Sequence, residues 1–143
     1  MGRRPRRHAV QPRRVTLIDT SAWVEFLRDT GSVVCVRVDA LLGDDVATCD
    51  PVRMEVLAGA RDDRHLDQLR RLLARAVTLP TGPTDYEQAA VLYRTCRRNG
   101  ETVRKLIDCL IAAVAIRDGF AVLHADADFD VLARHSPLLI DQP

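Results

Sequence analysis

The sequence lacks several features that would each indicate a particular class of protein. No apolar run approaches the roughly 18 residues needed to cross a bilayer, and the first residues contain no apolar segment typical of a secretion signal. The cysteines form no C-x-x-C pair, so they favour reduced core thiols over a zinc site or a disulfide framework. They are Cys35, Cys49, Cys96 and Cys109. We therefore expect a soluble, cytoplasmic protein, and with only six aromatic residues it has few platforms for base stacking.

The balanced net charge of +1 conceals an uneven distribution. Residues 1–14 contain six arginines and no acid, which leaves fifteen basic and twenty acidic residues in 15–143, a net charge of −5. We expect 1–14 to be a disordered tail, with a sequence-independent phosphate contact as the alternative reading. The 47% hydrophobic content of the chain is ordinary for a globular protein, so we expect 15–143 to form one acidic domain.

Short apolar runs alternate with helical patterns along the chain. Runs bounded by turn signals predict strands at 15–19, 45–49, 76–80, 120–124 and 138–140. Helical periodicity between these runs predicts four helices. The first, at 51–60, follows an Asp50 N-cap, and the second covers 61–76. The third runs from a Thr84–Glu87 capping box to Asn99, and the fourth covers 105–118 and stops at Gly119. This alternation predicts an α/β fold with a short, mainly parallel sheet covered by helices on both faces.

Two of the predicted strands run directly into carboxylates. Asp19 ends the first strand, and Asp126 and Asp128 follow the fourth. In a parallel sheet, ligands bind beyond the carboxyl ends of the strands, where these acids would lie together. The alternative is that they only cap the helices that follow, since Asp, Thr and Ser are common N-cap residues.

Two further acids lie on helices that are otherwise apolar or small. Asp108 is the only charged residue between Leu106 and Ile116, and a buried carboxylate needs a cationic partner. A local salt bridge to Arg104 or Lys105 would satisfy it. Glu55 has small neighbours one turn away, which leaves space beside its carboxylate.

Four acids at one edge of a sheet would repel one another strongly without a divalent cation. Oxygen-only ligands favour Mg²⁺ or Mn²⁺ over zinc. Magnesium held by carboxylates in turn indicates phosphate chemistry, in which the metal activates a water and stabilises the displaced oxygen.

The acidic segments together resemble the PIN-domain family, and within it the VapC-type toxins of bacterial toxin–antitoxin pairs. The resemblance extends from about Val15 to the C-terminus. It depends on the order and spacing of four motifs, LIDTSAWVEFL, MEVLAGA, LIDCLIAAVA and HADADFDVLA.

This resemblance implies a three-layer α/β/α fold and a metal-dependent endoribonuclease that hydrolyses RNA with a metal-activated water. The implied catalytic and metal-binding acids are Asp19, Glu55, Asp108 and Asp126, with Asp128 as a further metal ligand whose rank against Asp126 stays open. The implied substrate-binding residues are Thr20, Ser21, Arg104 and Lys105. Mg²⁺ is the implied cofactor, with Mn²⁺ as a substitute, and the implied partners are an antitoxin and a second copy of the chain in a homodimer or a heterotetramer.

Three other functions fit the sequence less well. A serine hydrolase is disfavoured because Ser21 lies in D-T-S and not in a G-x-S-x-G turn, and a structural role suits His124 better than a general base. A phosphatase using Asp19 as nucleophile would need an acid at position 21. A receiver-like signalling module would lack the two acids on apolar helices, and phosphorylation by a small phosphodonor would distinguish it from a nuclease.

Overall fold

The computed structural model describes residues 15–143, so the predicted disordered tail at 1–14 lies outside the described residues. Its centre is a five-stranded sheet in the order β3-β2-β1-β4-β5, and all four strand pairs are parallel. The strands are β1 (Thr16–Ile18), β2 (Val46–Cys49), β3 (Val77–Leu79), β4 (Ala121–Leu123) and β5 (Leu139–Ile140). Each lies within one of the five runs predicted from the sequence.

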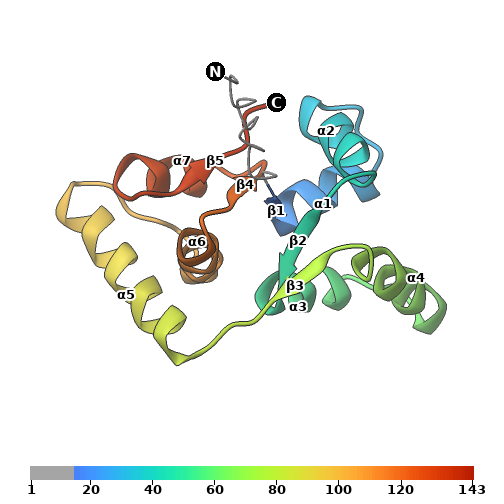
Figure 1. Cartoon of the computed structure of the whole chain (residues 1–143), viewed down its shortest axis with the longest axis horizontal. Helices are drawn as coiled ribbons and strands as arrows, with labels where there is room; N and C mark the ends of the chain where they lie inside the picture. Colours follow the sequence, from blue (N-terminus) through green and yellow to red (C-terminus); the bar gives the residue numbers. More distant parts are fainter. Residues whose placement is uncertain (1–14) are drawn as a thin grey trace, which may run out of the picture.

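Within residues 15–143, seven helices cover the two faces of the sheet (Figure 1). One group connects β1, β2 and β3: α1 (Thr20–Leu27), α2 (Val33–Leu41), α3 (Asp50–Ala58) and α4 (Asp63–Leu73). The other group leads to β4 and β5: α5 (Pro83–Arg98), α6 (Leu106–Asp118) and α7 (Ala127–Arg134). Because the sheet order reverses between β1 and β4, right-handed connections place the two groups on opposite faces. The predicted three-layer α/β/α fold is confirmed.

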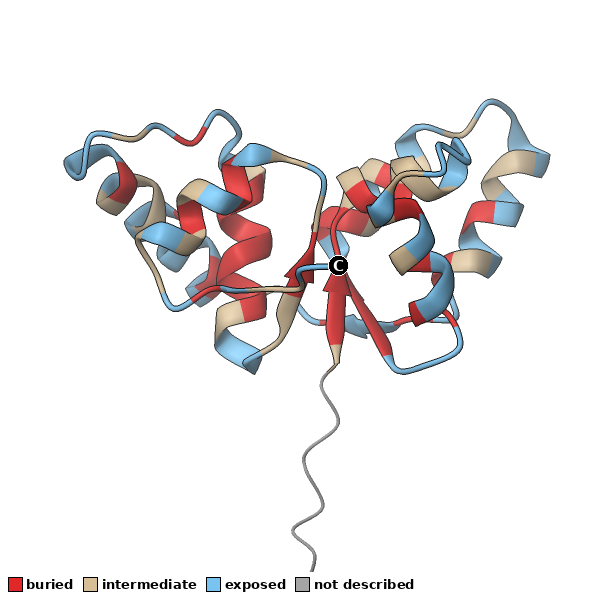
Figure 2. Ribbon diagram, turned by 90° about the horizontal axis from the view of Figure 1, so that it is seen from above, coloured by how far each residue is buried: buried red, intermediate tan, exposed pale blue. Residues whose placement is uncertain are grey.

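Burial is concentrated in the three central strands β2, β1 and β4 and in α6 (Figure 2), whereas the edge strands β3 and β5 are mostly exposed or half-buried. Cys109 to Ala115 are all buried, because α6 packs against α5, α7 and β4. A helix that is apolar on every side must be surrounded in this way. Trp23 and Phe129 are the largest fully buried side chains. Within residues 15–143, no helix is long and apolar enough to cross a membrane.

Helix boundaries differ from the sequence predictions at the start of α3 and at the start of α5. Cys49, and not Asp50, is the N-cap of α3, so Asp50 and Pro51 form its first turn. The predicted Thr84–Glu87 capping box is wrong, because α5 begins one residue earlier at Pro83 and Asp85 accepts the N–H of Gly82.

Helix α2 had no counterpart in the sequence predictions. Its many β-branched valines are typical of strands, and the signal that identifies it is the Ser32 N-cap, whose hydroxyl accepts the N–H of Cys35.

Candidate active site

The predicted acidic residues meet at the carboxyl edge of the sheet, beyond the adjacent strands β1 and β4. The ladder between these strands continues past their ends, because the N–H of Asp19 donates to the carbonyl of Leu123 at 3.0 Å. The chain leaves β1 toward one face and reaches β4 from the other. Such a topological switch point is where open α/β sheets bind ligands.

Asp19 is held rigidly at the start of α1 and still offers one free oxygen. Its Oδ2 accepts the backbone N–H of Ser21 at 2.9 Å and the Ser21 hydroxyl at 2.6 Å. The same hydroxyl accepts the N–H of Ala125 at 2.9 Å, which ties α1 to the segment after β4. Asp19 is 2% exposed, and its Oδ1 has no hydrogen-bond partner among the described residues. Burial raises the pKa of this carboxyl, against the lowering effect of the Ser21 hydrogen bonds.

Asp108 enters the same site from the first turns of α6 and is 3% exposed. Its Oδ2 is buried and has no partner in residues 15–143. Burial, followed by the negative charges of Asp19 and Asp126, raises the pKa of Asp108 to about 8. This carboxylate is therefore costly to ionise without a cation beside it.

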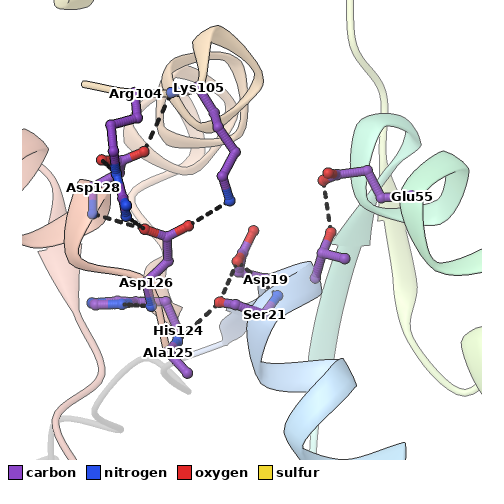
Figure 3. Close-up of polar contacts among 10 residues, drawn as sticks. Asp19, Ser21, Glu55, Arg104, Lys105, His124, Ala125, Asp126 and Asp128 are labelled. Atoms are coloured by element: carbon purple, nitrogen blue, oxygen red, sulfur yellow. Dashed lines mark hydrogen bonds and ion pairs between the residues drawn. The ribbon is translucent and has the colours of Figure 1, made fainter. Parts of the chain in front are cut away.

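Asp126 and Asp128 at the start of α7 are already paired with cations. Lys105 Nζ lies 2.8 Å from Asp126 Oδ2, while Arg104 bridges Asp126 Oδ1 at 3.4 Å and Asp128 Oδ1 at 3.3 Å (Figure 3). Burial alone would raise the pKa of Asp126, but the bonds from Lys105 and from the N–H of Asp128 lower it. One oxygen each of Asp108, Asp126 and Asp128 lies within 4.8 Å of the others, a spacing suited to a shared metal ion.

Glu55 approaches from α3, on the opposite side of the site from Asp126 (Figure 3). It is half-buried, and its Oε1 accepts the hydroxyl of Thr20 at 2.8 Å. The first turn of α1 thus positions two acids, Asp19 through Ser21 and Glu55 through Thr20. Both hydroxyls that the sequence assigned to the substrate are engaged with carboxylates.

All four acids of the predicted quartet line one pocket of about 290 Å³. Its lining also includes Thr20, Ser21, Lys105 and Glu25. Glu25 is absent from the sequence predictions, although it lies four residues after Ser21 on the same face of α1, a spacing that could have identified it. Two larger pockets at other places on the surface, one of about 500 Å³ and one of about 620 Å³, contain none of the quartet, and a third of about 310 Å³ includes Glu55 alone of the four acids.

The donor set fits a hard divalent cation. The buried, unpartnered oxygens of Asp19 and Asp108 belong to carboxylates that line the same pocket, and unpaired buried acceptors of this kind are costly. Every acidic group there offers oxygen, the ligand atom that Mg²⁺ and Mn²⁺ prefer. Asp128 is close to Asp108 and Asp126 but is not in the pocket lining.

The structure also decides between the alternative readings of individual residues. Arg104 and Lys105 pair with Asp126 and Asp128, and no ion pair in the described residues joins either cation to Asp108. The helix-capping alternative is correct as a description of Asp19 and Asp126, which are the N-caps of α1 and α7. Capping uses only one oxygen of Asp19, so it does not account for the other.

His124 makes the contacts of a structural residue and not those of a general base. Its Nδ1 accepts the N–H of Asp126 at 3.1 Å, its Nε2 lies 3.4 Å from Asp130, and its ring packs against Phe129. It does not line the acidic pocket.

Comparison with known proteins gives a consistent result. The PIN domain model matches residues 16–135. The chain is 51% identical over 122 residues to ribonuclease VapC11 of Mycobacterium tuberculosis, a match that covers 82% of this chain and 91% of the relative. The chain belongs to the PIN-domain family and, within it, to the VapC ribonucleases.

Solved structures agree at the level of the fold. A DNA-bound VapBC complex from Salmonella typhimurium includes a chain with a TM-score of 0.72 and 17% identity, covering 90% of this chain and 98% of that one. VapBC-5 from M. tuberculosis matches with a TM-score of 0.64 and 26% identity, covering 92% and 100% of the two chains.

Proposed function

We propose that this protein is a Mg²⁺-dependent endoribonuclease that acts as the toxin of a toxin–antitoxin pair. The observation that carries the proposal is the pair of buried carboxylate oxygens without partners, Asp19 Oδ1 and Asp108 Oδ2, on acids that line one pocket with Glu55 and Asp126. The 51% identity to a named ribonuclease supports RNA as the substrate. The four free, buried cysteines suit a reducing cytoplasm, where we place the protein.

The residues of the pocket have distinct roles in this proposal. Asp19, Glu55, Asp108 and Asp126 supply oxygens for the cation, with Asp128 as a supporting ligand. A bound Mg²⁺ would supply a water of lowered pKa and a counter-charge for the phosphate. Ser21 and Thr20 orient carboxylates, and Arg104 at the exposed rim contacts the RNA backbone. Hydrolysis in line would leave 5′-phosphate and 3′-hydroxyl ends without a covalent intermediate.

We also propose the partners that this function requires. A nuclease of this kind must be silenced in its own cell, and solved relatives are VapBC toxin–antitoxin complexes. A cognate antitoxin is therefore the expected partner, in a heterotetramer or larger assembly built on a homodimer of this chain.

The proposal is tested by incubating the purified protein with total bacterial RNA in Mg²⁺, in Mn²⁺, in Ca²⁺ and in excess EDTA. We expect discrete cleavage products with Mg²⁺ or Mn²⁺ and intact RNA with Ca²⁺, whose looser coordination suits this hydrolysis poorly, or with EDTA. Sequencing the RNA ends would identify the cleaved sequence.

Full cleavage in excess EDTA would refute the metal requirement. A parallel incubation with acetyl phosphate addresses the signalling alternative, because stable phosphorylation of an aspartate without RNA cleavage would replace the nuclease reading with a receiver-like one.

A further inference from the structure

One side chain in the acidic pocket is chemically unique in this protein. Lys105 is the only lysine of the chain, whose other twenty basic residues are all arginines. Among the described residues, it is also the only basic one in the lining of the acidic pocket, where its Nζ lies 2.8 Å from Asp126 Oδ2. The carboxylate that it contacts is one of the four predicted to bind the cation.

The backbone of Lys105 is fixed while its side chain is exposed enough to move. Its N–H donates to Asp128 Oδ2 at 3.3 Å, and its carbonyl accepts the N–H of Asp108 at 3.1 Å as α6 begins. Its side chain is 55% exposed. The ammonium can therefore leave Asp126 by rotation of the side chain alone, without any change in α6.

The neighbouring arginine is also exposed, but it differs from Lys105 in its partners and in its position relative to the pocket. Arg104 bonds to both Asp126 and Asp128, its side chain is 70% exposed, and it does not line the pocket. A planar guanidinium shared by two carboxylates suits a persistent bridge, whereas an ammonium is a compact charge on a flexible stem. Lys105 is therefore the cation of the two that can exchange the Asp126 carboxylate for another anionic partner.

We propose that Lys105 is an exchangeable counter-ion, which holds Asp126 until a divalent cation takes that carboxylate and then binds the phosphate of the RNA. This inference rests on the proposed nuclease function. The ammonium and the divalent cation compete for the same negative charge, so Lys105 weakens metal binding in the free protein. Once displaced, the ammonium remains at the rim of the pocket, where an RNA phosphate offers it a new charge-assisted hydrogen bond.

The competition is tested by measuring Mg²⁺ affinity calorimetrically for wild type, Lys105→Met and Arg98→Met. Arg98 is exposed and has no ion pair within residues 15–143, so its replacement controls for loss of one positive charge outside the site. We expect Lys105→Met to bind Mg²⁺ about two- to fivefold more tightly, in line with the modest strength of an exposed ion pair, and Arg98→Met to match wild type. Equal affinities in all three proteins would overturn the proposal.

The second half of the exchange is tested with an RNA oligonucleotide that the wild type cleaves, at saturating Mg²⁺. Loss of a charge-assisted phosphate contact should raise KM by roughly tenfold in Lys105→Met, with kcat changed by less than about twofold. A Lys105→Met enzyme with unchanged KM would show that the lysine does not reach the substrate.

A measurement on the native protein avoids any question of whether the variant folds. Because Lys105 is the only lysine, acetylation by an N-hydroxysuccinimide ester modifies it and the α-amino group alone among the amines, and mass spectrometry separates the two peptides. Saturating Mg²⁺ should raise the acetylation rate of Lys105 severalfold and leave that of the α-amino group unchanged.

An unchanged acetylation rate at Lys105, in protein that binds Mg²⁺ and cleaves RNA, would mean that the lysine belongs to a fixed structural ion pair. Absence of both Mg²⁺ binding and cleavage would refute the nuclease proposal as well.

Discussion

At the residue scale, the carboxylates of the site lie in different electrostatic environments. Asp126 is paired with two cations, whereas Asp108 is buried beside Asp19 and has no cationic partner among the described ion pairs. The raised pKa of Asp108 follows from its burial and from the nearby charges of Asp19 and Asp126.

Removing a charge from either unpartnered carboxylate should abolish catalysis without unfolding the protein. Asp19→Asn and Asp108→Asn each retain the shape of the side chain but remove the negative charge of a proposed ligand. We therefore expect each variant to show less than about a tenth of the wild-type RNA cleavage. That loss is equivalent to at least about 1.4 kcal/mol of transition-state stabilisation. Circular dichroism should show unchanged secondary structure. Near-normal cleavage by either variant would contradict its assignment as a ligand.

The metal-free protein should become less stable as pH rises from 6 to 9. The pKa of Asp108 is raised to about 8 in the folded state from an ordinary value of 3.8, so between these values the native state holds a proton that the unfolded chain has lost. The contribution of this proton to the free energy of unfolding is fully present below pH 4 and is lost as the pH rises through 8. Its steepest change is about 1.4 kcal/mol per pH unit for one proton.

Melting curves in EDTA at pH 6, 7.5 and 9 measure this dependence. Asp108→Asn cannot ionise at that position, so its melting temperature should vary less than that of wild type and should be the higher of the two at pH 9. Parallel pH profiles for the two proteins would indicate that Asp108 does not titrate in this range.

At the scale of single elements, α6 connects the core to the site. Its buried middle fixes the direction of the helix, its N-terminal turn carries Asp108, and its C-terminus ends at Gly119 in the left-handed conformation, with φ of 69°. Glycine adopts this conformation without the steric cost that a Cβ imposes. The end of the helix farthest from Asp108 can therefore be altered without touching the pocket.

Gly119→Ala should lower stability and leave cleavage intact. No heavy atom lies within 4 Å of the position of the added Cβ, so the cost is conformational alone, about 1 kcal/mol. We expect the melting temperature to fall by a few degrees, with kcat and KM for RNA unchanged. A large loss of activity at temperatures where the variant is folded would show that the end of α6 and the site are coupled.

At the scale of the whole molecule, residues 15–143 carry a net charge of −5 around an acidic pocket. This charge distribution opposes the binding of RNA in the absence of a cation. It also favours an inhibitor that presents a positive charge to the pocket.

The antitoxin should therefore place an arginine or lysine against Asp19, Glu55 or Asp108. Replacing that cation by alanine should weaken inhibition of RNA cleavage by at least tenfold, as expected when a buried charge pair loses one member. A structure of the complex in which no basic side chain approaches these acids would refute this mode of inhibition.

If the site binds Mg²⁺ as proposed, the ion should stabilise the whole fold, because the acids are assembled in the native state and separated in the unfolded chain. At pH 7 and a concentration one hundred times its dissociation constant, it should add about 2.7 kcal/mol to the free energy of unfolding. Thermal melts with and without Mg²⁺ measure the shift, and Asp108→Asn should show a much smaller one. A wild-type protein that melts at the same temperature in both conditions would count against a metal site.

The sequence by itself determined the α/β class, the five strands and the positions of the four acids, because apolar runs, turn residues and isolated charges are local patterns. It left helix α2 undetected, since the valines that favour strands there are overridden by tertiary packing and by the Ser32 cap. It also misplaced the start of α5, where the backbone N–H of Gly82 is satisfied by Asp85 and not by a Thr84–Glu87 box.

Only the tertiary structure decided how the charges pair, because partners distant in sequence are set by the sheet order. A local salt bridge from Lys105 or Arg104 to Asp108 was an alternative reading of the sequence, but α7 brings Asp126 and Asp128 to these cations instead. The Thr20 and Ser21 hydroxyls likewise bind Glu55 and Asp19. The sequence therefore specifies which carboxylates are present, and the packing of α1, α6 and α7 around the ends of β1 and β4 decides which of their oxygens stay without partners.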